Sequence, residues 1–350
     1  MLRNGYTTGS CMTAAACAAY RALKTAERPA SIELRLPGGG TLAVPVAEVR
    51  PGFAAVVKDG GDDPDVTTGH RVEVAVEPFD GVPDPRDYSD GNLVLTAGSG
   101  VGVATRPGLA VPVGKWAINP GPRRMLRDNL RPERRMRITV SVPDGEALAA
   151  ETLNPTLGVK GGISILGTSG IVRPYSNAAY AATVALQFRS LAASGFTVGA
   201  TATGSRTAAA LRRDYPELAP QSVVEIADFI HVAVRAAASA GLEKLIVGCM
   251  PGKLFKYACG EKNTHAHKNR LLMGRLAELN VPLPAGVDPA RFESMGELKA
   301  ALAPEAYRAA LEALDRGWKL NWDAANPISL RLACKIGFEP DGEYEAVLVK

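Results

Sequence analysis

The sequence predicts an α/β fold in two domains, an N-terminal α+β domain and a Rossmann-like parallel α/β domain. In the first half, strand-like segments follow one another with few clear helices between them. From about residue 151, units of a strand, a glycine loop and a helix repeat, which is typical of a parallel sheet with right-handed crossovers. We therefore expect domains at 1–150 and 151–285, and a helical region with a terminal strand at 286–350 that packs on either domain.

The composition indicates an ordinary globular protein. The chain has 350 residues, 46% of them hydrophobic and 22% charged, which is enough for two domains. No apolar run reaches the roughly 18 residues of a membrane helix, and no secretory signal is visible. Five scattered cysteines without a CxxC pair indicate a reducing cytoplasm and neither a disulfide framework nor structural zinc. A net charge of +4 is too mild to imply nucleic acid by itself.

The elements of the first half follow from composition and alternation. Residues 10–25 are rich in alanine and predict a helix, for which Thr7, Thr8 and Ser10 are candidate caps and Gly9 permits close approach of a ligand. The predicted strands, separated by Pro, Gly and Asp clusters, are 31–36, 41–46, 54–58, 71–76, 93–97 and 137–142.

The second half contains three predicted strand–loop–helix units. The first has a strand at Ile163–Leu166, which glycines flank on both sides, and its loop carries the hydroxyls of Thr168 and Ser169 and the charge of Arg173. A loop of this kind at the end of a strand is suited to hold a polar ligand. The remaining elements are expected as a helix at 176–194, a strand at 197–202, a helix to about 213, a helix at 222–240, a strand at 244–247, a helix to about 258 and a strand at 345–349.

Seven arginines lie between residues 123 and 137 and form the strongest local charge. They predict either a solvated helix face or a cradle for a polyanion, because guanidinium groups pair with carboxylate and phosphate. The run has no aromatic residues for base stacking, so a small molecule with several carboxylates fits better than nucleic acid.

Two glycine-rich loops resemble nucleotide motifs without matching them. Residues 98–102 read GxGxG instead of GxGxxG, which favours a ligand loop of another kind. Residues 248–253 read GxxxGK, one residue shorter than a P-loop, and Leu254 supplies no hydroxyl for magnesium. Lys253 and the neighbouring amides remain candidates to hold an anion.

Acidic and histidine clusters supply candidates for proton transfer. Residues 58–65 hold four carboxylates in a loop, which predicts either a polar turn or a site where crowding raises the pKa of one carboxyl so that it serves as a base. Their spacing is not that of an EF-hand. His265 and His267 form an HxH pair without an evident third ligand, so a ligand contact or proton handling at His265 is favoured over metal binding.

Five segments together resemble the CbiD family: 5–11, 58–69, 97–123, 153–174 and 251–267. The resemblance implies a two-domain cobalt-precorrin-5B C1-methyltransferase of anaerobic cobalamin biosynthesis that uses S-adenosylmethionine, with cobalt present only in the tetrapyrrole substrate. Carboxylates around such a macrocycle suit arginines and helix N-termini, and acidic residues suit the cationic donor. No membrane or nucleic-acid partner is expected. The protein is compatible with a homo-oligomer and with transient contacts to neighbouring enzymes of the pathway.

These considerations give a set of candidate site residues. The expected catalytic residues are Asp62, Asp63 and His265. The expected cofactor-binding residues are Thr7, Thr8, Gly98, Gly100, Gly102, Gly167, Thr168, Ser169 and Gly170. The expected substrate-binding residues are Arg123, Arg124, Arg173, Lys253, Asn263 and Thr264, and no protein metal site is expected.

Two alternative functions stay open. One is a phosphate- or ATP-binding, kinase-like enzyme, suggested by the glycine loop at 98–102, and the other is a non-catalytic tetrapyrrole-binding scaffold of the corrin pathway. The tail contains the segments 326–331 and 335–338, which are similar to the last motif of N-acetyltransferases. About 60 residues are too few for that fold by the size of ordinary domains, so we interpret the similarity as a chance helix-to-strand packing motif.

Overall fold

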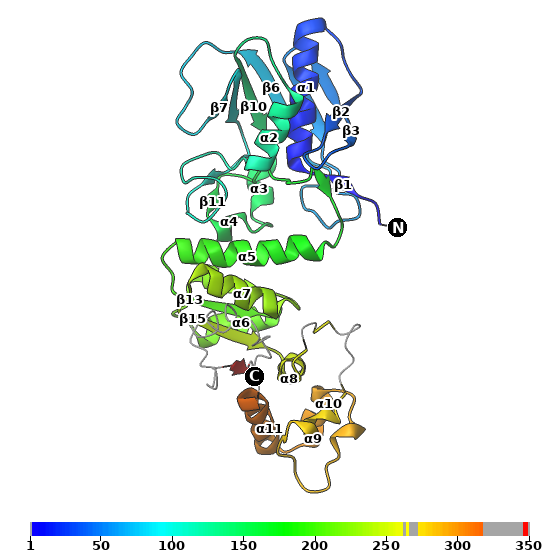
Figure 1. The fold of residues 1–350 in the computed structure, drawn as a ribbon, viewed down its shortest axis with the longest axis vertical. Helices are drawn as coiled ribbons and strands as arrows, with labels where there is room; N and C mark the ends of the chain where they lie inside the picture. Colours follow the sequence, from blue (N-terminus) through cyan, green and yellow to red (C-terminus); the bar gives the residue numbers. More distant parts are fainter. Residues whose placement is uncertain (1, 262–263, 266–271, 318–345, 349–350) are drawn as a thin grey trace. The chain divides into compact units, whose positions relative to one another are not determined.

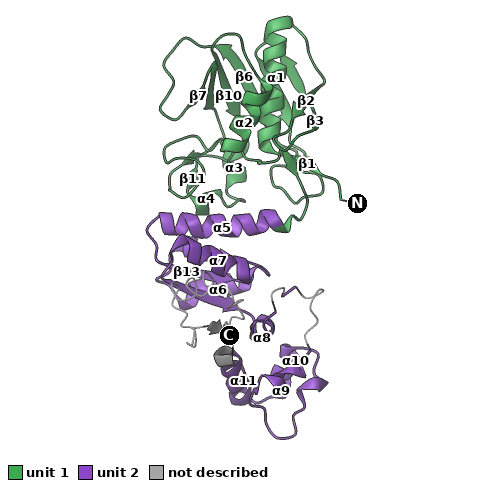
Figure 2. Cartoon of the chain, viewed as in Figure 1, with its two compact units in different colours: residues 1–177 green, residues 178–350 purple. Residues whose placement is uncertain are grey.

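The computed structural model describes residues 2–261, 264–265, 272–317 and 346–348. Contacts divide the chain into two compact units, 1–177 and 178–350, each of which is described by itself (Figures 1 and 2). Both contain helices and sheets, so the expected mixture of α and β structure is confirmed.

The division of the chain falls 27 residues beyond the expected boundary at 150 (177 − 150). Residues 151–177 belong to the first unit because β11 (Val159–Lys160) pairs with β9 (Val103–Ala104) and β12 (Ile171–Val172) pairs with β1 (Gly5–Tyr6). The segment 163–166, predicted as a strand of the parallel sheet, instead makes isolated parallel bridges from Ile163 to Val101 and from Ile165 to Ile118. That prediction is wrong, because an apolar run flanked by glycines does not identify the sheet that it joins.

The first unit is built on a six-stranded sheet whose order is β4-β5-β6-β10-β8-β7. Neighbouring strands are antiparallel except β10 and β8, which run parallel. The strands are β4 (Glu48–Arg50), β5 (Phe53–Val57), β6 (Arg71–Pro78), β7 (Tyr88–Asp90), β8 (Leu93–Ala97) and β10 (Met136–Ser141), and a separate hairpin joins β2 (Ser31–Arg35) to β3 (Thr41–Pro45). The six strands predicted in this half are confirmed within about two residues.

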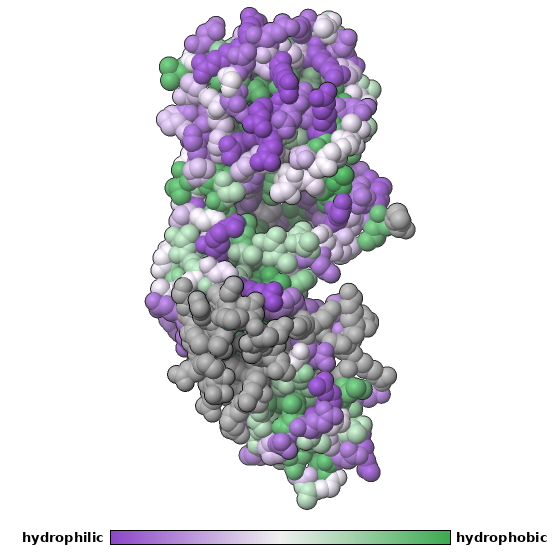
Figure 3. Space-filling model, viewed as in Figure 1, coloured by the Kyte–Doolittle hydropathy of each residue, from purple (hydrophilic) through white to green (hydrophobic). Residues whose placement is uncertain are grey.

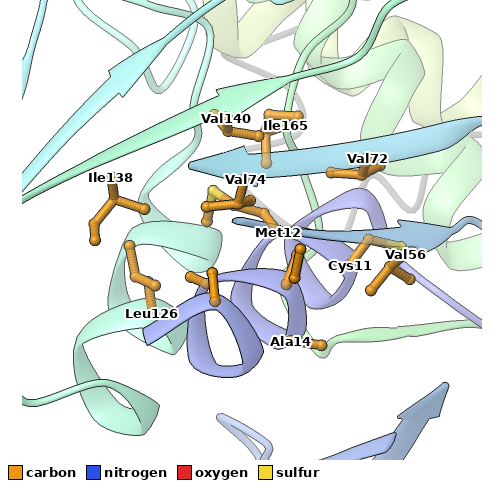
Figure 4. Packing of buried hydrophobic residues seen from close by; sticks show 14 of the residues in the cluster. Cys11, Met12, Ala14, Val56, Val72, Val74, Leu126, Ile138, Val140 and Ile165 are labelled. Atoms are coloured by element: carbon orange, nitrogen blue, oxygen red, sulfur yellow. The ribbon is translucent and has the colours of Figure 1, made fainter. Parts of the chain in front are cut away.

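Helix α1 (Thr8–Thr25) is the centre of this unit's core, and it confirms the helix predicted from alanine content. Nearly every residue from Thr8 to Ala19 is buried, and the small side chains let the helix lie against β5 and β6. Figure 4 shows Met12 beside Val74, with residues of α2 (Pro120–Asn129) and β10 completing the cluster. The short helices α3 (Gly145–Ala149) and α4 (Asn154–Leu157) precede β11.

The second unit contains a four-stranded sheet in the order β14-β13-β15-β16, in which all neighbours are parallel. Its strands are β13 (Val198–Ala202), β14 (Val223–Glu225), β15 (Lys244–Cys249) and β16 (Ala346–Leu348). The helices are α5 (Asn177–Ala193), α6 (Ser205–Asp214), α7 (Ile230–Ala240), α8 (Pro251–Ala258), α9 (Arg275–Glu278), α10 (Met295–Ala301) and α11 (Pro304–Gly317). The helix predicted at 222–240 starts only at Ile230, because residues 223–225 form a buried strand.

The surface of the first unit in the view of Figure 3 is mostly hydrophilic, as expected for a unit whose apolar residues surround α1. Within the described residues, no helix combines the length and the apolar character that crossing a bilayer requires.

The burial of Ile138 on β10 predicts a large loss of stability when its side chain is shortened. Ile138 is fully buried, so Ile138→Ala leaves a cavity and should lower the free energy of unfolding by about 2–5 kcal/mol. Val82→Ala is the matched control, because Val82 is 91% exposed and its truncation should change stability by less than about 0.5 kcal/mol. Urea unfolding measures both variants, and equal effects of the two would contradict the described packing.

Candidate functional site

Segments that lie far apart in the sequence meet where α1 begins. Strand β1 pairs with β12, which follows the loop 166–170, and Asn4 bridges to Gly61 in the acidic loop. Just before α2, the backbone N–H of Asn119 donates to the carbonyl of Ile165 at 2.9 Å. Four of the motif segments singled out in the sequence therefore share one edge of the first unit.

The loop 166–170 is held directly on the N-terminus of α1. The backbone N–H of Gly9 donates to the carbonyl of Leu166 at 3.0 Å, and the N–H of Thr7 donates to the carbonyl of Gly170 at 3.1 Å. The hydroxyl of Thr8 accepts from the N–H of Leu166 at 3.0 Å, and Thr7 caps the helix by accepting from the N–H of Ser10. Both threonine hydroxyls thus hold protein groups together, and their contact with a cofactor stays a prediction.

Three glycines allow this contact to be close. A Cβ at Gly9 would lie 2.7 Å from Cγ of Pro122, and one at Gly121 would lie 2.6 Å from the carbonyl oxygen of Gly167. Gly167 itself has φ +133°, and a Cβ there would lie 2.3 Å from the Thr7 hydroxyl. The start of α2 is consequently packed on the same loop as the start of α1. Thr168 and Ser169, between these contacts, are exposed.

The four carboxylates of the acidic loop have separate partners. Asp59 forms an ion pair with Arg3, and Asp62 accepts from the backbone N–H of Arg3 at 2.7 Å. Asp63 accepts from the backbone N–H of Tyr175 at 3.1 Å. The fourth, Asp65, lies 2.6 Å from the ammonium of Lys58, whose side chain is only 1% exposed.

This separation changes the expected acid–base behaviour of the loop. The hydrogen bond from Arg3 lowers the pKa of Asp59 below its usual value. Burial acts to raise the pKa of Asp65, but hydrogen bonds from Lys58 and Thr67 outweigh it, and the net shift is downward. The expectation that crowding raises a carboxyl pKa is therefore wrong for these two residues, because each carboxylate has a positive or donor group of its own.

The glycine-rich loop at 98–102 is tightly packed against other residues of the first unit. A Cβ at Gly98 would lie 2.2 Å from the Ser141 hydroxyl, and one at Gly102 would lie 2.4 Å from Cγ1 of Val159. Gly100 has φ +70°, and a Cβ added there would lie only 1.8 Å from the carbonyl oxygen of Val142. The kinase-like alternative rested on this loop, and its glycines are accounted for by packing.

The arginine run does not form a single cradle. On α2, Arg124 is exposed, whereas Arg123 stacks at 4.0 Å on the ring of Tyr88. Arg127 lies 3.3 Å from Asp90. Arg137, on β10, lies 3.8 Å above the ring of Phe79. The expected cradle for a polyanion therefore reduces to the arginines at the start of α2, together with the exposed Arg173 after β12.

In the second unit, a polar cluster lies at the carboxyl ends of β14 and β15. The ammonium of Lys253 lies 3.1 Å from Asp228 and donates to the carbonyl of Ala227 at 2.7 Å. Thr264 is buried and donates to Asp228 at 2.7 Å. Burial acts to raise the pKa of Asp228, but the hydrogen bonds from Thr264 and Lys253 produce a net lowering. His265 is exposed and adds to this lowering, and Asn263 lies outside the described residues.

Comparison with known proteins relates the whole arrangement to one family. The CbiD family model matches residues 1–174. The cobalt-precorrin-5B C(1)-methyltransferase of Nitratidesulfovibrio vulgaris is 43% identical over 317 residues, which cover 84% of this chain and 78% of the relative. The chain belongs to the CbiD family.

Other CbiD relatives are similarly close. The proteins of the same name from Rubrobacter xylanophilus and Polaromonas sp. are 43% and 40% identical, covering 88% and 82% of this chain and 80% of each relative. A crystal structure of a cobalamin biosynthesis protein (cbiD) from Archaeoglobus fulgidus is 29% identical over 76% of this chain and 83% of that one, with a TM-score of 0.42.

The C-terminal tail has a second similarity that CbiD membership does not include. The family model of GNAT acetyltransferases matches residues 303–347. The similarity noticed at 326–338 is thus also detected by comparison, although that segment lies outside the described residues. Its interpretation as a chance packing motif stays a prediction.

Sequence reasoning missed several residues of these clusters. Asp228 follows a short buried strand, and carboxylates at the carboxyl ends of parallel strands are often ligand-binding residues. The sequence signal was missed because the strand was predicted as part of a helix. Lys58 was assigned to an acidic loop, and Tyr88 gave no signal, because its short strand β7 is not among the predicted strands. Among the described residues, no group of three or more His, Cys, Asp or Glu is placed to hold a metal ion.

The buried pair of Lys58 and Asp65 predicts a pH-dependent contribution to stability. Asp65→Asn leaves a buried ammonium without its counter-charge and should lower the free energy of unfolding at pH 7 by about 2–3 kcal/mol, less than for a fully buried pair because Asp65 is 25% exposed. Because folding lowers the pKa of Asp65, this contribution is present above the unfolded value of about 3.9 and disappears as the pH falls through the folded value.

Urea unfolding of the wild type and the variant at pH 7 and in acid tests this expectation. The difference between the two proteins should shrink in acid. Asp80→Asn, at an exposed position, is the matched control and should leave stability within about 0.5 kcal/mol. A difference that stays constant with pH would contradict the assigned pair.

Proposed function

We propose that this protein transfers a methyl group from S-adenosylmethionine to ring carbon C1 of cobalt-precorrin-5B, giving cobalt-precorrin-6A in cobalamin biosynthesis. The observation that carries the proposal is the identity of about 40% with several cobalt-precorrin-5B C(1)-methyltransferases over more than four fifths of this chain. In the step itself the nucleophilic C1 supplies the electron pair for a new bond to the methyl carbon, while the bond from that carbon to the sulfonium sulfur breaks and its pair stays on sulfur, which leaves in S-adenosylhomocysteine.

We further infer that the second unit is a Rossmann-like domain extending to about residue 285, with 286–350 as a helical region. The parallel order β14-β13-β15 supports this, since β14 and β15 lie on opposite sides of β13, and the C-terminal region adds its strand β16 to the same sheet beside β15. Where successive strands are added first on one side of a central strand and then on the other, the loops after neighbouring strands diverge and leave room for a ligand. The cluster of Asp228, Lys253 and Thr264 lies at that carboxyl edge.

Residues at the start of α1 fit the chemistry of the methyl donor. The donor supplies an electrophilic methyl on a cationic sulfur, and it carries a ribose diol and an amino-acid group. The exposed carboxylate of Asp62 suits the positive charge, and the exposed hydroxyls of Thr168 and Ser169 suit the diol or the carboxylate. Thr7, Thr8 and the surrounding glycines position this loop, so that the reactive groups are aligned and water is excluded.

Cationic residues fit the macrocycle, whose edge carries acetate and propionate groups. Arg123 and Arg124 lie in the first turns of α2, where the helix dipole adds to their attraction for carboxylates, and Arg173 follows β12. In the second unit Lys253 is a further candidate, although Asp228 already neutralises part of its charge. Cobalt enters the reaction as part of the substrate.

The roles of Asp62 and Asp63 are proposed to be electrostatic and proton-accepting, with His265 as a further proton carrier. The scattered cysteines favour a reducing, cytoplasmic setting. Homo-oligomer formation and passing contacts with other enzymes of the same pathway are compatible with this role.

The direct test incubates the purified protein with S-adenosylmethionine and cobalt-precorrin-5B without oxygen and measures product mass. A product one methyl heavier is expected. If an authentic relative forms that product and this protein does not, the assignment fails. Tetrapyrrole binding without turnover would instead favour the scaffold alternative.

Removing the charges of Asp62 and Asp63 should reduce activity much more than stability. Asn at either position keeps an oxygen that accepts from the backbone N–H of Arg3 or Tyr175, so the loop should stay in place. We expect the kcat/KM of methyl transfer to fall about tenfold or more, with less than about 0.5 kcal/mol lost in stability. The exposed Asp80→Asn serves as control. Loss of the melting transition together with activity would mark these residues as structural.

A further inference from the structure

A pocket of about 320 Å³ lies in the first unit between α2 and the strands β7 and β8. Its apolar lining comes from Leu93, Leu95 and Leu126, all of which are buried. Its charged lining includes Arg123 and Lys115. A lining of leucine side chains and cationic groups is complementary to a short alkyl chain that ends in an anion.

The ring of Tyr88 holds the guanidinium of Arg123 in a fixed place. The Arg123 carbon Cζ lies 4.0 Å from the ring centroid, and the Tyr88 hydroxyl donates to the carbonyl of Trp116 at 2.8 Å, which fixes the ring. The Nε of Arg123 is buried and makes no hydrogen bond. A stack on an aromatic face orients a guanidinium without neutralising it, unlike a carboxylate.

The carboxylates that line the pocket are engaged elsewhere. The two oxygens of Asp87 accept from the indole N–H of Trp116 at 3.2 Å and from the backbone N–H of Asp84 at 3.0 Å. Asp90 pairs with Arg127 at 3.3 Å.

Lys115 forms no ion pair with a carboxylate of the described residues. Its ammonium donates to the backbone carbonyl of Asp87 at 2.8 Å. Within the described part of the chain, neither Arg123 nor Lys115 forms an ion pair, and Asp84, whose carboxylate interacts electrostatically with Lys115, is itself paired with Arg86. Both cations of the pocket therefore remain able to bind an anionic ligand.

We propose that this pocket is a subsite for an alkyl carboxylate, with Arg123 as the main binding residue, Lys115 as the second cation and Tyr88 as the residue that positions Arg123. The inference rests on the proposed function, which supplies two sources of such a group: an acetate or propionate arm of the tetrapyrrole, and the amino-acid end of the methyl donor. The volume lies at the low end for ligand pockets, which range from about 300 to 1,000 Å³, and so suits one arm better than a whole macrocycle.

Calorimetric titration of the full chain tests the subsite without turnover. One arm uses uroporphyrin, a porphyrin with eight acetate and propionate carboxylates, as a non-reacting probe, and the other uses S-adenosylhomocysteine. Arg123→Gln should weaken one of them about tenfold or more, because a hydrogen bond to a charged group contributes about 1.5–3 kcal/mol. Weaker porphyrin binding identifies a tetrapyrrole arm, and weaker S-adenosylhomocysteine binding identifies the donor carboxylate.

Two further variants separate binding from folding. Arg28→Gln removes a positive charge at an exposed position that does not line the pocket, and it should leave both affinities unchanged. Tyr88→Leu keeps both cations but removes the stacking face, so it should weaken the same ligand by a smaller factor, and Arg123→Lys should restore only part of the affinity. If Arg123→Gln fails to fold, Lys115→Gln, which leaves the Arg123 stack in place, must weaken the binding of one of the two ligands, and unchanged binding of both would overturn the subsite.

Unchanged affinity for both ligands in folded Arg123→Gln would overturn the subsite. This result is independent of methyl transfer, because neither probe reacts. A wild type that binds the porphyrin through Arg123 but yields no methylated product would overturn the proposed function and leave the carboxylate subsite standing. If the wild type methylates cobalt-precorrin-5B and Arg123→Gln leaves the KM of both substrates unchanged, the proposed function stands and the carboxylate subsite is overturned.

Discussion

The first unit depends on how the backbone N–H groups at the start of α1 are satisfied. Nearly all of the helix from Thr8 to Ala19 is buried, so water cannot reach the free donors of its first turn. The carbonyls of Leu166 and Gly170 accept from Gly9 and Thr7 instead. An unsatisfied buried donor costs about 1–3 kcal/mol, which requires the loop 166–170 to lie in direct contact with the helix.

That contact determines what else gathers at this edge. Because the loop reaches α1, the following strand β12 pairs with β1, and β1 in turn bridges to the acidic loop through Asn4 and Gly61. The same loop also packs on Gly121, which brings the first turn of α2 and its arginines close. A single requirement, satisfying buried helix donors, thus collects acidic, hydroxyl and cationic groups from distant parts of the sequence.

Alternation and alanine content were sufficient to predict α1 and six strands of the first unit, but not the partners of these elements. Buried and half-buried residues alternate along β10, and the strand predicted at 137–142 lies one residue from its observed bounds. The run Ile163–Leu166 alternates two buried isoleucines with the half-buried Ser164 and the exposed Leu166, but this alternation does not identify the sheet that the run joins, and it was assigned to the wrong sheet. Asp65 and Lys58 were understood as loop charges, since local sequence does not reveal that the ammonium is buried. The candidate site needed contacts across more than 100 residues, which no local pattern contains.

The choice of partner explains why arginines of one run have different roles. Arg127 and Arg137 have carboxylates nearby, at 3.3 Å from Asp90 and 3.6 Å from Glu77, so much of their charge is compensated within the protein. Arg123 has an aromatic ring in place of a carboxylate. Such stacking stabilises a cation by about 0.5–2 kcal/mol without cancelling its field. A guanidinium that is already oriented loses little side-chain entropy on binding, so its charge stays available to a ligand's carboxylate.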